Sequence, residues 1–185
     1  MKTMKTWPLL LLAAMLFIAG CSKKDTKLPV SAEKMEAIVS PLINKDGTEI
    51  GKVTMSEDEK GVTISITAEG LPPGLHGVHI HETGVCTPPT FESAGGHFNP
   101  TKKEHGFDNP KGFHLGDLPN VEVGEDGKVE AQVTTADLTL KPGAEMSLLD
   151  KDGSALVIHE GQDDYKTDPA GNSGARIACA EINKK

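Results

Sequence analysis

The chain has 185 residues, of which 20 are glycine and only 4% are aromatic, a composition that suits a turn-rich β protein better than a helical bundle. Its formal net charge is −8 and no basic stripe runs along it, which argues against nucleic acid as a partner. The length allows one domain with a short leader and tail.

Residues 1–20 have the features of an export signal. Lys2 and Lys5 precede an apolar run over 7–19, which is shorter than the ~20 residues of a membrane span and is typical of a signal peptide. The segment 18–21, Ile-Ala-Gly-Cys, resembles the bacterial lipobox, in which the cysteine is lipidated and becomes the mature N-terminus. The alternative is an ordinary signal peptide, or an uncleaved anchor with a chance cysteine.

We therefore expect a lipoprotein signal peptide over 1–20, a lipidated Cys21 with a flexible tether over 21–34, and a folded domain over 35–185. The protein would be anchored to a membrane by its lipid, in the cell envelope and outside the cytoplasm. That compartment is oxidising, so a disulfide between Cys86 and Cys179 is permitted.

The domain shows the alternation of β structure. Apolar and polar side chains alternate strictly over residues 62–69, which predicts a strand with one buried face. Further strands are predicted at 37–39, 50–55, 78–81, 121–123, 128–133, 155–159 and 176–182.

Two long stretches, 82–117 and 160–175, do not have a strand pattern. Both are rich in glycine and proline and both adjoin histidines; loops of that length are uncommon unless they are functional or tied down. With no internal repeat and no second domain boundary, the chain predicts an all-β fold, an antiparallel barrel or sandwich of about eight strands with two elaborated loops.

All seven histidines lie between positions 76 and 159, at the edges of strands and loops. His79 and His81 are two apart on a predicted strand, so their imidazoles point to the same side and can chelate one ion. His159 ends another predicted strand and can supply a third nitrogen. These strand histidines favour an open, redox-capable site of the kind that suits copper.

The long loop carries the other ligands. His97, His105, His114 and Asp117 lie within it, and the run His-Leu-Gly-Asp at 114–117 brings an imidazole close to a carboxylate. Three nitrogen ligands and one oxygen ligand suit a closed tetrahedral zinc site.

Four motifs in order make the pattern specific. Residues 74–81 (Gly-Leu-His-Gly-Val-His-Ile-His), 94–100 (Ala-Gly-Gly-His-Phe-Asn-Pro), 114–118 (His-Leu-Gly-Asp-Leu) and 171–179 (Gly-Asn-Ser-Gly-Ala-Arg-Ile-Ala-Cys) resemble signatures of the copper/zinc superoxide dismutases. The resemblance covers residues 35–182, and the short gap from His81 to Cys86 is similar to the bacterial branch of that family. It implies an eight-stranded Greek-key barrel that binds one copper and one zinc ion per chain.

The resemblance also implies a role for each site residue. Copper would be bound by His79, His81, His97 and His159. Zinc would be bound by His97, His105, His114 and Asp117, so that His97 bridges the two ions.

Residues outside the ligand set also receive roles from the resemblance. Asp163 would link His79 with His105, and Arg176 would guide the anion beside the open copper position. Cys86 and Cys179 would form a disulfide. His76, the one histidine without a metal role, would be structural.

The implied activity is that of an oxidoreductase, the conversion of superoxide to oxygen and hydrogen peroxide by alternate reduction and oxidation of copper, with His97 carrying a proton. Two other functions are open: a metal-binding module without turnover, and a purely structural lipoprotein. The intact ligand set argues against the structural lipoprotein, and the presence of Arg176 argues against the binding module. The sequence leaves the oligomeric state open, with a homodimer as one option.

Overall fold

In the computed structural model, residues 36–183 can be described; the predicted leader, Cys21 and the tether lie outside them. The described chain forms eight antiparallel strands. They are β1 (Ile38–Asn44), β2 (Glu49–Asp58), β3 (Gly61–Ala68), β4 (Gly74–His81), β5 (Asp117–Val123), β6 (Val129–Thr135), β7 (Ser154–His159) and β8 (Arg176–Ile182). Within residues 36–183, no helix has the length and apolar character needed to cross a membrane.

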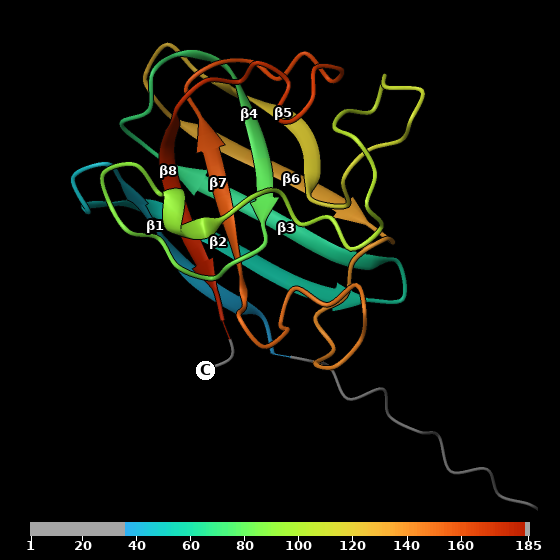
Figure 1. Ribbon diagram of the computed structural model, residues 1–185. Coiled ribbons are helices and arrows are strands. Elements are labelled where there is room, and N and C mark those ends of the chain that lie inside the picture. Colours follow the sequence, from blue (N-terminus) through green and yellow to red (C-terminus); the bar gives the residue numbers. More distant parts are fainter. Residues whose placement is uncertain (1–35, 184–185) are drawn as a thin grey trace, which may run out of the picture. The chain divides into compact units, whose positions relative to one another are not determined.

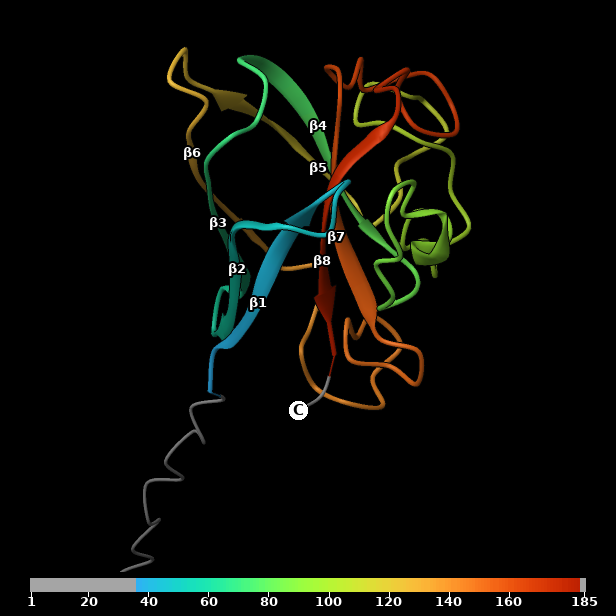
Figure 2. The ribbon, with the colours of Figure 1, turned by 90° about the vertical axis from the view of Figure 1, so that its left-hand side faces the viewer.

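The strands form one sheet in the order β5-β4-β7-β8-β1-β2-β3-β6, which curls into a nearly closed barrel with β5 and β6 brought together. Figure 2 shows β1, β2, β3 and β6 on one side and β4, β5, β7 and β8 on the other. The connections from β3 to β4 and from β6 to β7 join strands that are not neighbours in the sheet, as in a Greek key. The predicted all-β barrel is confirmed.

Alternating side chains produce the core. In β3, Val62, Ile64 and Ile66 are buried while the intervening polar residues face outward. β7, by contrast, is buried along its whole length, because the barrel packs on one face and the long loops cover the other. A strand covered on both sides can carry polar groups only where they find partners, and His159 at its end is such a group.

The strand β1 is longer than predicted. Its sequence contains Pro41, which weakens a strand signal. In the structure β1 pairs with β2 from Ile38 to Ile43 but with β8 only through Ile43 and Asn44. The ladder with β8 is therefore absent at Pro41, and a proline is tolerated there.

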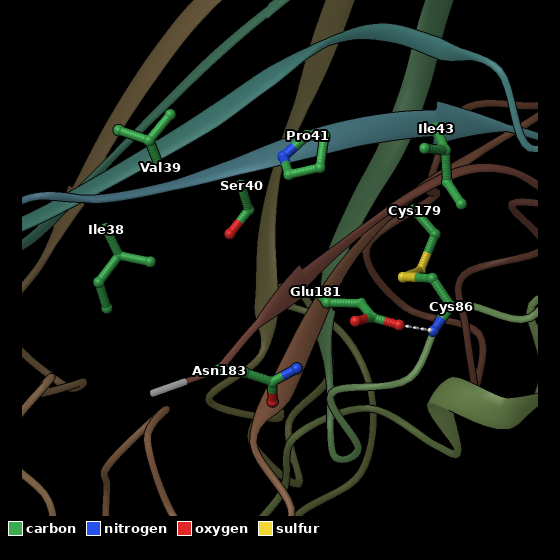
Figure 3. A pocket seen from close by; sticks show the side chains of 9 residues that line it. All are labelled: Ile38, Val39, Ser40, Pro41, Ile43, Cys86, Cys179, Glu181 and Asn183. Carbon is green, nitrogen blue, oxygen red and sulfur yellow. Dashed lines mark hydrogen bonds between the residues drawn. A yellow bond between two sulfur atoms is a disulfide. The ribbon is translucent and has the colours of Figure 1, made fainter. Parts of the chain in front are cut away.

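Where β1 and β8 separate they leave a hollow of about 420 Å³ (Figure 3). The Cys86–Cys179 disulfide closes one end of it, and the carboxylate of Glu181 accepts a hydrogen bond from the Cys86 N–H at 2.8 Å. No histidine lines this hollow, so it is separate from the histidine cluster described below.

The segment between β6 and β7 is fixed by Glu57. Its carboxylate accepts hydrogen bonds from the Leu140 N–H at 2.7 Å and from the Thr139 hydroxyl at 2.8 Å, and it pairs with Lys141 at 3.4 Å. The leucines of this segment are buried in the hydrophobic core; they are Leu138, Leu140, Leu148 and Leu149. Burial raises the pKa of Glu57, but the hydrogen bonds outweigh it and the net direction is down.

We expect Glu57→Gln to lower the free energy of unfolding by about 1–2 kcal/mol at pH 7, because a charged acceptor is lost. A pKa that is lowered in the folded state contributes stability above the unfolded pKa and loses it as the pH falls through the folded pKa. Urea unfolding of the metal-free proteins at pH 7 and pH 3 should therefore show a difference that shrinks in acid. Glu59→Gln, on an exposed neighbour, is the matched control; a loss that is equal at both pH values would contradict this role.

Candidate metal centre

Two strands and one loop bring the histidines together. His79 and His81 lie on β4, and His159 ends β7, which pairs with β4. The loop 82–116 turns back onto β4, where His97 forms a bridge with His81 and the Phe98 N–H donates to the Ile80 carbonyl at 2.8 Å. In Figures 1 and 2 this loop lies beside the loop 160–175, on the same side of the barrel.

The first cluster consists of His79, His81, His97 and His159, whose ligand atoms all lie within 4.8 Å of one another. Each ring directs one nitrogen inward: His79 Nδ1, His81 Nε2, His97 Nε2 and His159 Nε2 are buried and have no hydrogen-bond partner among the described residues. Buried polar atoms are normally paired, so four such atoms around one point indicate a site built for an ion.

The outward nitrogens of these rings are all engaged. His79 Nε2 donates to Asp163 Oδ2 at 2.9 Å, and His81 Nδ1 donates to the Gly95 carbonyl at 3.0 Å. His159 Nδ1 donates to the Gly174 carbonyl at 3.1 Å. Because a neutral imidazole carries one proton, these bonds leave a lone pair on each inward nitrogen, the form that binds a metal.

The second cluster surrounds Asp117 Oδ1. That oxygen lies 2.8 Å from His97 Nδ1, 3.1 Å from His105 Nδ1 and 3.2 Å from His114 Nδ1, and the His97 and His114 nitrogens are 3.2 Å apart. Ligands at the zinc distance of about 2.0–2.1 Å in a tetrahedron are about 3.3 Å from each other. The four groups therefore fit a tetrahedral ion.

His79 also lies within 4.8 Å of the ligand atoms of His97, His105 and Asp117. Its Nε2 is held by Asp163 and its free Nδ1 is one of the nitrogens of the first cluster, so we assign His114 to the second cluster instead. The second oxygen of Asp117 accepts the Gly106 N–H at 2.9 Å and the His114 N–H at 3.0 Å, which fixes the carboxylate.

Burial controls the protonation of the first cluster. It lowers the pKa of His81 to about 2, of His159 to about 3 and of His97 to about 4, and it lowers that of His79 as well. These rings are therefore neutral near pH 7, as ligands must be.

Hydrogen bonds, and not burial, decide the protonation of the two carboxylates. Burial raises the pKa of Asp117 and of Asp163, but hydrogen bonds from the imidazoles outweigh this effect and hold both pKa values well below their usual range. For His105, burial lowers the pKa, yet the two carboxylates raise it to about 9.

Asp163 links the two clusters. Its Oδ2 accepts from His79 Nε2 at 2.9 Å and its Oδ1 accepts from His105 Nε2 at 3.0 Å. The side chain is fully buried. One carboxylate thus contacts a ring in each cluster, the arrangement that the family resemblance implies.

Arg176, the only arginine in the chain, lies half-buried at the start of β8. Its two terminal nitrogens donate to the Phe91 carbonyl at 2.6 Å and the Gly95 carbonyl at 2.7 Å. The Gly95 carbonyl also accepts from His81, so the guanidinium lies beside the first cluster. A hollow of about 530 Å³ opens there, lined by Arg176 together with Lys45 and Glu92.

The Cys86–Cys179 disulfide is present and joins residues 93 positions apart. In the chain-entropy description a loop of that length is worth ~4–5 kcal/mol. The disulfide also ties the loop 82–116 to β8. That loop supplies the carbonyl groups that bind the guanidinium of Arg176, and β8 is the strand that carries Arg176.

His76 has no part in either cluster. Its Nδ1 lies 2.7 Å from the His159 carbonyl and its Nε2 lies 2.8 Å from the Pro72 carbonyl, a structural placement next to a cluster residue.

Asn120 and Tyr165 both contact Asp163, although no motif in the sequence marks either of them. The roles of the Gly95 and Gly174 carbonyl groups are not evident from the sequence either, because a backbone acceptor leaves no mark in the side-chain pattern.

An antiparallel Greek-key barrel with two adjoining histidine clusters defines a class of dinuclear metalloproteins. A model of the family described as copper/zinc superoxide dismutase (SODC) matches residues 49–182. The chain belongs to this family.

Individual relatives agree with this assignment. The chain is 46% identical over 184 residues to the superoxide dismutase-like protein YojM of Bacillus subtilis, covering 94% of each chain. It is 54% identical over 142 residues to superoxide dismutase [Cu-Zn] 2 of Aquifex aeolicus, covering 76% of this chain and 83% of that one.

Solved structures are similar as well. A SOD-like protein from Bacillus subtilis has a TM-score of 0.76 and 52% identity over 78% of this chain and 97% of its own. The Cu/Zn superoxide dismutase from Brucella abortus has a TM-score of 0.66 and 34% identity, over 80% of this chain and 99% of its own. Copper and zinc are the metals of the family, and the two clusters fit them.

We expect Asp163→Asn to weaken zinc binding by about 10–100-fold, because an amide cannot accept hydrogen bonds from both His79 and His105. Equilibration with a chromophoric chelator measures this affinity. Asp126→Asn, which makes the same charge change at the turn between β5 and β6, should bind zinc like the unaltered protein. Equal affinities in the two variants would contradict the bridging role of Asp163.

Proposed function

We propose that this chain is a superoxide dismutase that converts superoxide to oxygen and hydrogen peroxide. The observation that carries the proposal is the pair of clusters sharing His97, one of which adjoins the single arginine. The family membership and the names of the relatives support the same activity.

The ligand sets favour one metal each. The first cluster offers four imidazole nitrogens, a donor set that suits copper in a redox site. The second offers three imidazoles and a carboxylate in a buried position, which suits zinc. We therefore assign copper to His79, His81, His97 and His159, and zinc to His97, His105, His114 and Asp117.

A bound copper ion supplies the one-electron chemistry, since it can take an electron from one superoxide and give it to the next. The reaction consumes two superoxide ions and two protons. His97 directs Nε2 to the first cluster and Nδ1 to the second, so Nε2 can hold one of these protons while Nδ1 keeps the ring in place. The other proton would come from the solvent.

Arg176 would attract and orient the anion. Its guanidinium is fixed by two carbonyls and remains a cation although burial lowers its pKa. With two divalent ions bound, an imidazolate at His97, and Asp117, Asp163 and Arg176 charged, the centre carries a formal charge of about +2. An acidic protein can therefore still attract an anion to this cleft.

Pulse radiolysis of the full chain in detergent, loaded with copper and zinc, tests the activity. We expect superoxide to decay much faster than in buffer. Full metal occupancy without acceleration would instead favour the metal-binding module.

We expect Arg176→Ala to keep both metals but to slow superoxide decay by about tenfold or more and to flatten its dependence on salt, because a local cation raises association rates by roughly 10–10³. Arg176→Lys keeps the charge but not the paired carbonyl contacts, so its rate of superoxide decay should lie between those of the unaltered chain and Arg176→Ala. Pulse radiolysis over a range of salt concentrations measures both effects; unchanged kinetics in Arg176→Ala would count against the guiding role.

We also propose that the protein is exported and held at a membrane by a lipid on Cys21, outside the cytoplasm. The support is the charged and apolar leader followed by Ile-Ala-Gly-Cys at 18–21. Each lipid methylene that is buried adds about 0.8 kcal/mol of membrane affinity.

Cys21→Ser should therefore move the protein out of the membrane fraction and abolish labelling by a fatty-acid analogue. Ser22→Ala, a change at the next residue, should leave both unaltered. Persistent lipid labelling of Cys21→Ser would rule out this anchor.

A further inference from the structure

Tyr165, the only tyrosine in the chain, lies where three segments of the metal centre meet. It belongs to the loop 160–175, its hydroxyl reaches β5, and its backbone contacts the loop 82–116. None of these contacts is to a metal ligand side chain, and the proposed reaction does not use the phenol.

The backbone of Tyr165 is in the left-handed region, with φ 60°, a conformation that costs energy for a residue other than glycine. It lets the Tyr165 N–H donate to Asp163 Oδ1 at 2.7 Å, while the Tyr165 carbonyl accepts the Asp108 N–H at 2.9 Å. Gly106 packs directly on that carbonyl, where a Cβ would clash. The backbone of Tyr165 therefore joins Asp163 to the loop that supplies His105.

The hydroxyl of Tyr165 makes a second connection, to β5. It accepts the Asn120 N–H at 2.6 Å. The Asn120 side chain pairs with the backbone of Asp163 in both directions, donating to its carbonyl and accepting its N–H at 2.9 Å each. Asn120 and Tyr165 thus hold Asp163 from its backbone and from its carboxylate.

Aromatic packing covers this connection. The Tyr165 ring lies 5.5 Å from that of Phe107, which lies 5.1 Å from Phe113. Both phenylalanines belong to the loop 82–116, so ring contacts join the two loops.

We propose that Tyr165, together with Asn120, is a positioning residue that holds the Asp163 carboxylate between His79 and His105 and so slows the release of zinc. The inference rests on the proposed function, since it assumes zinc in the second cluster. Tyr165 acts through Asp163 and does not touch the metal.

The test is a cycle of variants that separates positioning from general stability. Zinc-loaded full chain is mixed with a chromophoric chelator and the rate of zinc release is recorded for Tyr165→Phe, Asp163→Asn and the double variant. We expect Tyr165→Phe to speed release several-fold, and Tyr165→Ala to speed it by about 10–100-fold, the range for loss of a group that orients a ligand.

In the Asp163→Asn background the same Tyr165→Phe change should have little further effect, because residues that act through one another are not additive. Lys166→Ala, an exposed neighbour, should release zinc like the unaltered chain. Val62→Ala, in the core strand β3, lowers stability away from the clusters and should also leave the release rate unchanged.

Unaltered release in both Tyr165 variants would overturn the inference, and so would equal acceleration in the presence and absence of Asp163. So would a Val62→Ala variant that releases zinc as fast as Tyr165→Ala, because the effect would then follow stability alone. These outcomes leave the proposed function intact, whereas an unaltered chain that retains no zinc would overturn both.

Discussion

The position of His97 is the constraint on which the metal centre depends. One imidazole must present a nitrogen to each of two clusters, so its backbone has to lie between them. The loop 82–116 meets this need by returning to β4, where backbone hydrogen bonds on both sides of His97 fix it against His81. A loop held only by side chains would allow the ring to tilt, and the two clusters would no longer share it.

Burial and hydrogen bonding then prepare the remaining rings. Each ring of the first cluster other than His97 has one nitrogen bonded to a carbonyl or to Asp163 and the other left free. Removal from water keeps these rings neutral, and the bonded oxygen decides which nitrogen carries the proton. The centre is thus pre-organised by groups that do not bind metal, which include the carbonyls of Gly95 and Gly174.

The two loops depend on one another. The disulfide ties the first part of the loop 82–116 to β8, and Asp163 ties the loop 160–175 to His79 and His105. Arg176 contacts both loops: its guanidinium is hydrogen-bonded to the loop 82–116, and its backbone directly follows the loop 160–175 in the chain. Its orientation toward the first cluster is therefore a property of both loops, although it is a single residue on a strand.

The sequence by itself determined the β architecture and most of the chemistry. Strict alternation at 62–69 marked β3, and the predicted bounds of β8 agree with the structure, because burial of one face requires period two. The spacing of His79 and His81, the place of His159 at the end of a predicted strand and the resemblance to the family together pointed to the residues that lie in the two clusters. Only the tertiary structure decided the full length of β1, since a proline is tolerated where the neighbouring strand has separated, and it alone revealed Asn120, Tyr165 and the backbone carbonyls. Asn120 meets Asp163 and Tyr165 across 43 and 45 positions, and Gly95 and Gly174 act through carbonyl groups that every residue possesses, so no local pattern in the sequence distinguishes them.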